Sequence, residues 1–309
     1  MTLVIVGHEQ VEDGYGSVWR KDNDSKEITL RSEGLFAVAD SIITVTGSNG
    51  DTPLLSGLRK IYPIPIKLWK PSFLDVYFNG YFETYIESSC FVAFAGSTLT
   101  ATHALNLISD HLCNLQISYK FNRGEYIVQR HCETNVLSDS KNAIWDKHMF
   151  LDRYFQKLLT AQYIAEVIEH SINTALKSAQ KYRLSKDEIN KMHTDFAAGI
   201  HCPTTGQHFL FLYRMQITQK EDLVEVYTKR EEIKSDTVAV LGMRSEFEER
   251  AQKKYFEALK SGSSTGKEMF KFLNDSIKEV SSKGKFSIDK PSFHMKFEDG
   301  LLEKINFEY

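Results

Sequence analysis

Strand-like and helix-like segments follow one another in groups along this chain of 309 residues. The order is strands, two helices, strands, two helices, strands. The expected early strands are 2–7, 34–45, 58–69 and 88–96, and the later ones are 194–201, 207–215, two within 223–242, and a final hairpin turning at "EDG". The expected helices begin after 97 and at about 147–182, 244–260 and 266–281. Because strands do not alternate singly with helices, we predict an α+β fold, a four-layer αββα sandwich of two antiparallel sheets between helical layers.

The length suits one large domain or two small ones, and 42% hydrophobic residues are enough for a sizeable core. The chain shows no internal repeat, low-complexity segment or linker. We therefore predict a single domain over 1–309. A polar stretch with two glycines at about 11–33 interrupts the early strands and indicates a long hairpin or an inserted loop.

The charge is nearly balanced, with 38 Lys and Arg against 41 Asp and Glu. This balance argues against nucleic acid or an anionic membrane as a partner. The four cysteines lie far apart without a CxxC spacing, so neither a disulfide framework nor a zinc site is expected, and a reducing cytoplasm fits. No apolar run reaches the roughly 18 residues that would indicate a membrane-spanning helix.

Four segments of the first half carry a more specific signal. They are "TLVIVG" (2–7), "FAVADSIITV" (36–45), "GLRKIYPI" (57–64) and "FVAFAGSTLTATHAL" (91–105). In this order they resemble the proteasome-type N-terminal nucleophile hydrolases, the group of proteasome β-subunits and HslV-like peptidases. The resemblance implies the same αββα fold, with insertions near 11–33 and 70–87.

The resemblance also implies a catalytic set of Thr2, Asp40, Lys60 and Gly96. Removal of Met1 would expose the α-amine of the threonine, whose pKa near neutrality lets it take the hydroxyl proton. A lysine beside the hydroxyl lowers the hydroxyl pKa, and a buried aspartate keeps that lysine charged. The backbone N–H of a glycine can bind the oxyanion that forms on the scissile carbonyl.

Each of these residues also has an ordinary structural interpretation. Thr2 could be a plain first-strand residue, and Gly96 could simply end a strand before Ser97 caps the next helix. Lys60 could be a solvated edge-strand lysine, with Arg59 as the alternative basic residue at the site. Asp40 is less ordinary, because it interrupts an apolar strand and a lone buried acid is costly unless it is paired.

The leading functional prediction is a threonine-type endopeptidase with no cofactor and no metal. The resemblance implies a peptide or unfolded protein as substrate, a homo-oligomeric ring or stack, and an ATP-dependent unfoldase as a possible partner. A non-catalytic scaffold or sensor subunit is the alternative from another class, and an amidase acting on small molecules is a third possibility.

Two further patterns are interpreted as ordinary. His103, His111 and His131 have no metal-like pairing in the sequence, so we expect core or solvated histidines. The segment "SGSSTGK" (261–267) lacks the spacing of a phosphate-binding loop and joins two helices, so we expect no nucleotide site there.

Overall fold

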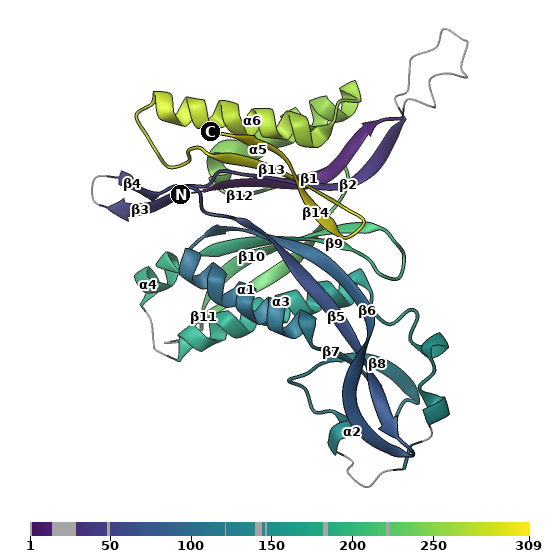
Figure 1. The fold of residues 1–309 in the computed structure, drawn as a ribbon. Helices are drawn as coiled ribbons and strands as arrows, with labels where there is room; N and C mark the ends of the chain where they lie inside the picture. Colours follow the sequence, from purple (N-terminus) through teal and green to yellow (C-terminus); the bar gives the residue numbers. More distant parts are fainter. Residues whose placement is uncertain are drawn as a thin grey trace, which may run out of the picture.

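The computed structural model describes residues 2–13, 29–47, 50–120, 122–139, 144–145, 147–181, 185–220 and 223–309 (Figure 1). A five-stranded antiparallel sheet has the order β12-β1-β2-β13-β14. Its strands are β1 (Leu3–Glu12), β2 (Leu30–Ala39), β12 (Val238–Gly242), β13 (Ser292–Glu298) and β14 (Leu301–Glu308). Strands β1 and β2 are neighbours inside this sheet, and two residues of the candidate site lie at their ends: Thr2 just before β1 and Asp40 just after β2.

A seven-stranded sheet has the order β11-β10-β9-β6-β5-β7-β8, and β3 and β4 form a separate two-stranded sheet. The strands of the larger sheet are β5 (Ile61–Leu74), β6 (Tyr77–Gly96), β7 (Leu115–Lys120), β8 (Glu125–Arg130), β9 (Thr194–His201), β10 (His208–Lys220) and β11 (Leu223–Ile233). The small sheet pairs β3 (Ile43–Gly47) with β4 (Gly50–Leu55).

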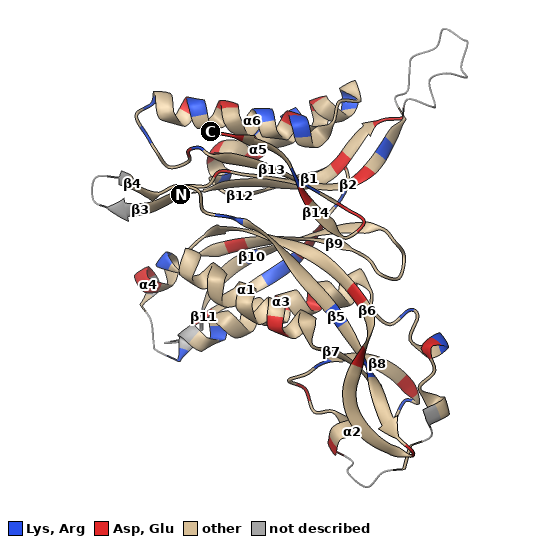
Figure 2. Cartoon of the chain, in the orientation of Figure 1, with Lys and Arg blue, Asp and Glu red and all other residues tan. Residues whose placement is uncertain are grey.

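Helices cover the outer faces of both sheets in Figure 1. They are α1 (Thr98–Cys113), α2 (Val136–Asp139), α3 (Ala161–Gln180), α4 (Lys186–Lys191), α5 (Arg244–Ser261) and α6 (Thr265–Ser282). Helices α5 and α6 lie over the five-stranded sheet, and α1 and α3 lie under the seven-stranded one. Charged residues of both signs are spread along the described helices and strand ends, with no concentration of one sign on a single element (Figure 2).

The apolar residues of the central strands divide between cores by strict alternation. In β1, Leu3 and Ile5 pack toward α5 and α6, whereas Val4 and Val6 pack between the two sheets. In β6, Phe91 and Ala93 face the space between the sheets, while the intervening residues pack toward α1 and α3. Strands that are buried on both faces read as continuous apolar runs, which explains "TLVIVG" and "FVAFAG".

The predicted fold class, a clean four-layer sandwich of two antiparallel sheets, is wrong. The seven-stranded sheet is mixed, because β5 pairs in parallel with β7 through Leu68 and Trp69 opposite Leu115 and Gln116. From the end of β6, α1 runs back along the sheet in the direction of β5, and the end of α1 lies beside Trp69 of β5. Only Asn114 separates α1 from β7, so β7 continues in the same direction and lies parallel to β5. The long β5–β6 ribbon also curls away from the helical layers and carries β7 and β8 with it (Figure 1).

Several element boundaries also differ from the predictions. The strand expected over 34–45 ends at Ala39 and resumes as β3, with Asp40 at the break. The long helix expected from 147 begins only at Ala161, after 3₁₀ turns at Lys147–Met149 and Asp152–Tyr154. The expected insertion near 70–87 is the outer part of the β5–β6 hairpin. Of the polar stretch near 11–33, residues 14–28 lie outside the described residues.

The hairpin expected at "EDG" is confirmed, as β13 and β14 pair with Glu298 opposite Leu301. The strands expected over 194–201 and 207–215 also form a hairpin, because His201 in β9 pairs with His208 in β10. Both turns place a glycine at positive φ, where a residue with a Cβ is disfavoured.

The start of α6 is occupied by a carboxylate from β1. Glu9 is buried, and its two oxygens accept hydrogen bonds from Ser264 Oγ at 2.6 Å and from the Gly266 N–H at 2.9 Å. The first turn of a helix favours a negative charge. At the start of α6, in the segment "SGSSTGK", these donors are therefore occupied by a carboxylate of the protein itself.

Candidate functional site

Thr2 lies at the head of β1, between the ends of β12 and β2. Its carbonyl oxygen accepts a hydrogen bond of 2.9 Å from the Met243 N–H. Gly242 crosses this carbonyl so closely that a Cβ at Gly242 would lie 1.8 Å from the Thr2 oxygen, and its φ is +89°. Only glycine tolerates both conditions. The turn at Gly242 and Met243, just before α5, thus holds the threonine in place.

Asp40 lies where β2 ends, and its carboxylate is fully buried. Oδ1 accepts a hydrogen bond of 2.8 Å from the Leu3 N–H, and Oδ2 accepts one of 3.2 Å from the Ile42 N–H. The Asp40 N–H in turn donates to the Leu3 carbonyl at 3.2 Å. This break in the strand therefore ties the aspartate to the residue that follows Thr2.

Lys60 comes immediately before β5, and its side chain is buried. Its Nζ donates to Thr2 Oγ1 at 2.9 Å and to Asp40 Oδ2 at 2.9 Å. Its carbonyl accepts from the Phe94 N–H at 3.1 Å, which fixes the lysine against β6. The alternative basic residue, Arg59, points elsewhere, with its guanidinium 5.7 Å from the centre of the Tyr62 ring. Of the two basic residues, Lys60 is the one that reaches Thr2.

Burial sets the electrostatics of this pair. Loss of water lowers the pKa of Lys60 from its ordinary value, and the attraction and hydrogen bond of Asp40 oppose that change. Burial likewise raises the pKa of Asp40, while the Lys60 charge and the Leu3 and Ile42 N–H groups oppose the rise. A buried lysine with a lowered pKa gives up its proton more easily than an exposed lysine does.

Gly96 lies on the wall of a cavity of about 760 Å³ that Thr2 and Lys60 also line. Its φ is +130°, and a Cβ there would lie 2.2 Å from the His193 carbonyl oxygen. The next residue, Ser97, caps α1 by accepting from the Thr100 N–H at 3.4 Å, as expected from the sequence. The structure thus brings Thr2, Lys60 and Gly96 to one cavity and places Asp40 directly behind the lysine.

No motif in the sequence pointed to the residues on the opposite wall of this cavity. Asn190, Lys191 and His193, at and just after the end of α4, line it. His193 Nε2 lies 4.0 Å from Asp195 Oδ1, and Arg214 Nη1 lies 3.6 Å from the other oxygen of Asp195. These side chains come from segments about a hundred residues or more beyond the motifs at the front of the chain, so only the fold shows that they meet.

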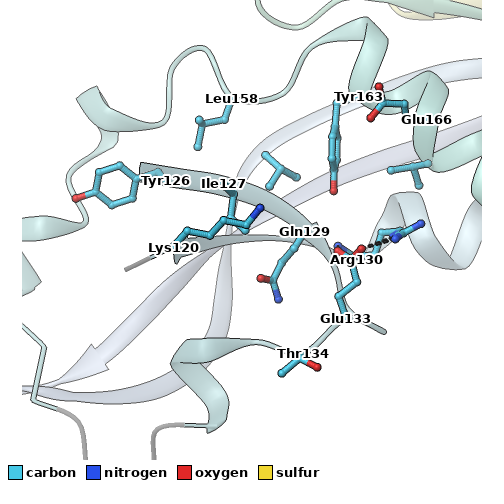
Figure 3. Close-up of a pocket in the computed structure, with 12 residues that line it drawn as sticks. Lys120, Tyr126, Ile127, Gln129, Arg130, Glu133, Thr134, Leu158, Tyr163 and Glu166 are labelled. Atoms are coloured by element: carbon cyan, nitrogen blue, oxygen red, sulfur yellow. Dashed lines mark hydrogen bonds and ion pairs between the residues drawn. The ribbon is translucent and has the colours of Figure 1, made fainter. Parts of the chain in front are cut away.

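A second cavity, of about 620 Å³, lies away from Thr2, between β8 and the start of α3 (Figure 3). Its lining includes Tyr126, Tyr163 and an ion pair between Arg130 and Glu133. The Arg130 Nε donates to a Glu133 oxygen at 3.1 Å, and the Arg130 N–H donates to the other oxygen at 3.0 Å. Arg130 and Glu133 therefore satisfy each other's charge on this wall of the cavity.

Comparison with known proteins does not support the family resemblance inferred from the motifs. No family model matches the chain, and no curated protein matches it. Among solved structures, the chain is similar to a mutant of Anbu from Hyphomicrobium sp. strain MC1, with 10% identity and a TM-score of 0.40 over all of this chain and 86% of that chain. The assignment to the proteasome β-subunit and HslV-like family is therefore wrong, because a likeness this low does not establish a common fold.

Two other sequence expectations concern the whole chain. All four cysteines, Cys90, Cys113, Cys132 and Cys202, are free thiols. Among the helices that the structure describes, none is both long enough and apolar enough to cross a bilayer.

Proposed function

We propose that this chain is a threonine-type amide hydrolase whose nucleophile is Thr2 Oγ1. Cleavage of the peptide bond between Met1 and Thr2 frees the α-amine that acts as the base for this hydroxyl. The observation that supports it best is the buried lysine between hydroxyl and carboxylate, with Lys60 Nζ 2.9 Å from Thr2 Oγ1 and 2.9 Å from Asp40 Oδ2. Met1 itself lies outside the described residues. The proposal rests on this geometry and needs no family membership.

A buried ion pair of this kind has little value as a stabilising element. Removing two charges from water costs about as much as their attraction returns, and apolar residues of similar size often do as well. The hydrogen bond from Lys60 to the Thr2 hydroxyl is better explained by a catalytic role of the lysine than by a contribution to folding stability. Clusters in which burial and a specific partner shift a pKa beside a cavity are frequent at active sites.

In the proposed reaction, the free α-amine of Thr2 accepts the proton of Oγ1 as the oxygen attacks the carbonyl carbon of an amide. The Lys60 ammonium favours the developing alkoxide by its charge, and Asp40 keeps that ammonium oriented. The Gly96 N–H is assigned to the carbonyl oxygen of the tetrahedral intermediate. Collapse of the intermediate breaks the C–N bond, and the α-ammonium returns the proton to the leaving amine. Water then hydrolyses the ester on Thr2.

The substrate is proposed to be a peptide. The cavity beside Thr2 is lined by apolar residues of the β3 region, among them Ile43 and Val45, and by polar residues from the opposite wall. Such a mixed surface suits an amide with side chains on both sides better than one compact polar molecule. Self-assembly of copies, an unfoldase partner and a cytoplasmic location stay predictions from the sequence.

The test is turnover of a panel of fluorogenic peptides and small-molecule amides by the processed protein. Thr2→Val keeps the shape of the side chain and removes the hydroxyl, and we expect a loss of at least about a hundredfold in kcat/KM. Thr2→Ser keeps a hydroxyl and should retain measurable turnover. Turnover that is equal in Thr2→Val and wild type would refute the proposal. No turnover in wild type across the panel would favour the non-catalytic scaffold.

A further inference from the structure

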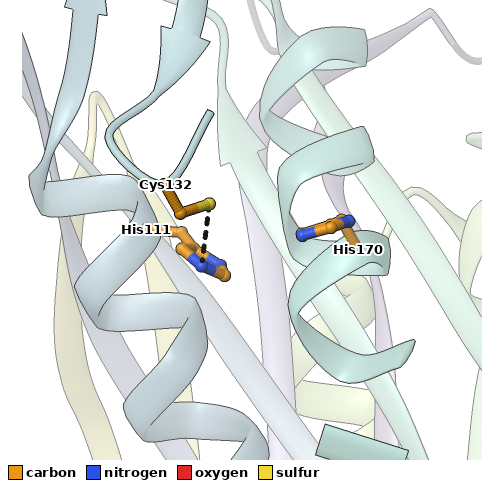
Figure 4. A group of neighbouring side chains, drawn as sticks. All are labelled: His111, Cys132 and His170. Carbon is orange, nitrogen blue, oxygen red and sulfur yellow. Dashed lines mark hydrogen bonds between the residues drawn. The ribbon is translucent and has the colours of Figure 1, made fainter. Parts of the chain in front are cut away.

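Three side chains that are common metal ligands converge at the end of α1 that is far from Gly96. His111 comes from the last turn of α1, Cys132 from the turn after β8, and His170 from the middle of α3. One potential ligand atom from each lies within 4.8 Å of the other two. Figure 4 shows the Cys132 sulfur above the His111 ring, with a ring nitrogen of His170 pointing toward both from the opposite helix.

Hydrogen bonding fixes the tautomer of His111. Ser171 Oγ donates its one proton to the Val167 carbonyl at 2.7 Å, and it lies 2.8 Å from His111 Nδ1. Since that hydroxyl has no second proton, Nδ1 must carry the hydrogen and donate it to Ser171. Nε2 is then left with a free lone pair, and it is the atom that faces Cys132. An imidazole oriented through its other nitrogen in this way is typical of a metal ligand.

The spacing between the histidine and the cysteine fits a tetrahedral metal. Cys132 Sγ lies 3.7 Å from His111 Nε2. Bond lengths of about 2.0 Å to nitrogen and 2.3 Å to sulfur at a tetrahedral angle place these two atoms about 3.5 Å apart. His170 lies on the open side of the same group, with its ring centre 5.5 Å from that of His111.

The surroundings of the cluster also suit a metal. Cys132 is exposed, so an ion can reach its sulfur from solvent. Around the cluster, Asp110 faces His131 at 3.5 Å, and Glu133 is engaged by Arg130. The two acids offset the nearby positive charge.

We propose that His111, Cys132 and His170 form a binding site for a divalent transition metal of borderline softness, with zinc as the natural occupant. Nitrogen and thiolate donors favour zinc over magnesium or calcium. Three protein ligands leave a fourth position for water. The bound metal would join α1, α3 and the turn after β8, and it would lie about 20 Å along α1 from the Thr2 cavity, given a rise of 1.5 Å per residue. This site is independent of the proposed hydrolase function.

The experiment is a titration of the reduced, metal-free full chain with Co²⁺, followed by displacement with Zn²⁺. We expect one equivalent to bind with the intense visible absorption of tetrahedral Co²⁺ and an ultraviolet thiolate-to-metal band. Cys132→Ser should abolish the thiolate band. Cys113→Ser is the matched control. It removes another free thiol, at the end of the helix that carries His111, and should leave the spectrum unchanged. His170→Gln should weaken binding by at least about tenfold.

Ser171→Ala tests the orienting role separately. It keeps all three ligands and removes the partner of His111 Nδ1, and loss of such a partner typically costs about 10–100-fold in metal affinity. Absence of a thiolate band in folded wild type, or a band that survives in Cys132→Ser, would overturn the proposal. Circular dichroism of each variant shows whether a lost band reflects lost ligands, because Cys132 and His170 are not buried and their replacement should leave the fold intact.

Discussion

The ammonium nitrogen of Lys60 lies 2.9 Å from the hydroxyl oxygen of Thr2, and both side chains are almost fully withdrawn from solvent. The two residues are 58 positions apart, one before β1 and the other before β5. Contact between the starts of strands in two different sheets requires the sheets to be packed face to face at this end. The contact between Lys60 and Thr2 therefore depends on how the two sheets pack on each other.

The first prediction concerns the buried charge pair. Lys60→Met keeps the length of the side chain but leaves the Asp40 carboxylate buried without its cation. Removal of one partner of a buried pair typically costs about 3–5 kcal/mol of unfolding free energy. Urea denaturation should show this loss, and adding Asp40→Asn to Lys60→Met should recover part of it.

Lys67→Met is the control for that measurement. Lys67 lies on β5, a short way beyond Lys60, but its ion pair with Glu87, at 3.2 Å, is exposed to solvent. An exposed pair contributes about 0–1 kcal/mol. Equal losses in the two lysine variants would mean that the Lys60–Asp40 pair is not buried as described.

The second prediction concerns the close approach of Gly96 to β9. Gly96→Ala would put a Cβ 2.2 Å from the His193 carbonyl oxygen. Gly57→Ala is matched to it, because Gly57 also has positive φ, at +85°, but has open space around it. Both changes incur the backbone cost of about 1–2 kcal/mol, and only the first adds a clash of about 1–3 kcal/mol. Similar thermal unfolding of the two variants would contradict the described contact.

The third prediction concerns the carboxylate at the start of α6. Glu9→Gln replaces one of the two accepting oxygens by an NH₂ group, which cannot accept a hydrogen bond. Either Ser264 Oγ or the Gly266 N–H then loses its acceptor. We expect a loss of about 1–3 kcal/mol in unfolding free energy, as for a buried donor left without a partner. Glu12→Gln, at the exposed end of the same strand, should change stability by less than about 0.5 kcal/mol. An unchanged unfolding free energy in Glu9→Gln would show that α6 does not depend on the carboxylate of Glu9.

The fourth prediction is a pH dependence of stability that arises from His294. Burial, with Lys267 and Lys296 nearby, lowers the pKa of His294 to about 4 from its ordinary 6.5. Between pH 6.5 and 4 the unfolded chain therefore binds a proton that the folded chain does not, and stability falls as the pH falls. The loss is complete below pH 4 and amounts to about 3 kcal/mol, since one pKa unit is about 1.4 kcal/mol.

His294→Gln removes this titration because glutamine stays neutral throughout. From pH 7 to pH 4 the unfolding free energy of wild type should fall by about 3 kcal/mol relative to that of His294→Gln. Parallel curves for the two proteins would show that His294 titrates normally in the folded state.

The central strands could be predicted from the sequence because their signal is local. Val4, Val6, Phe91 and Ala93 are buried in runs of apolar residues that end at glycine, so the buried parts of β1 and β6 were expected as strands 2–7 and 88–96. The more exposed remainders, up to Glu12 in β1 and from Tyr77 in β6, were not expected as strand. The turn at Asp299 and Gly300 was equally clear from its residues.

The mixed character of the large sheet could not be predicted in the same way. Pairing of β5 with β7 depends on how far α1 carries the chain back along the sheet, and only Leu68 and Trp69 on β5 take part in it. The expected helix from 147 failed for a related reason. Leu151 and Phe155 have helical spacing, but Phe155 instead packs with Phe150 in an aromatic cluster that includes Phe73 and Tyr85.

The motif residues lie together in the structure, although the family assignment that linked them is wrong. Lys60 contacts Thr2 and Asp40, and Gly96 lines the same cavity as Thr2 and Lys60. That these four residues form an active site stays a proposal. The histidine and cysteine cluster was missed, because His111, Cys132 and His170 come from two helices and a turn and have no regular spacing. Metal ligands that meet only through tertiary packing leave no pattern in one sequence.

Intact-mass measurement of the protein isolated from its native source tests the central claim most directly. The proposed chemistry requires a free α-amine on Thr2, because that amine is the base for Oγ1. We expect a mass that corresponds to a chain beginning at residue 2, and we expect Thr2→Ser to lose Met1 in the same way. A native protein that retains Met1 would contradict it, since the amine would then belong to the wrong residue.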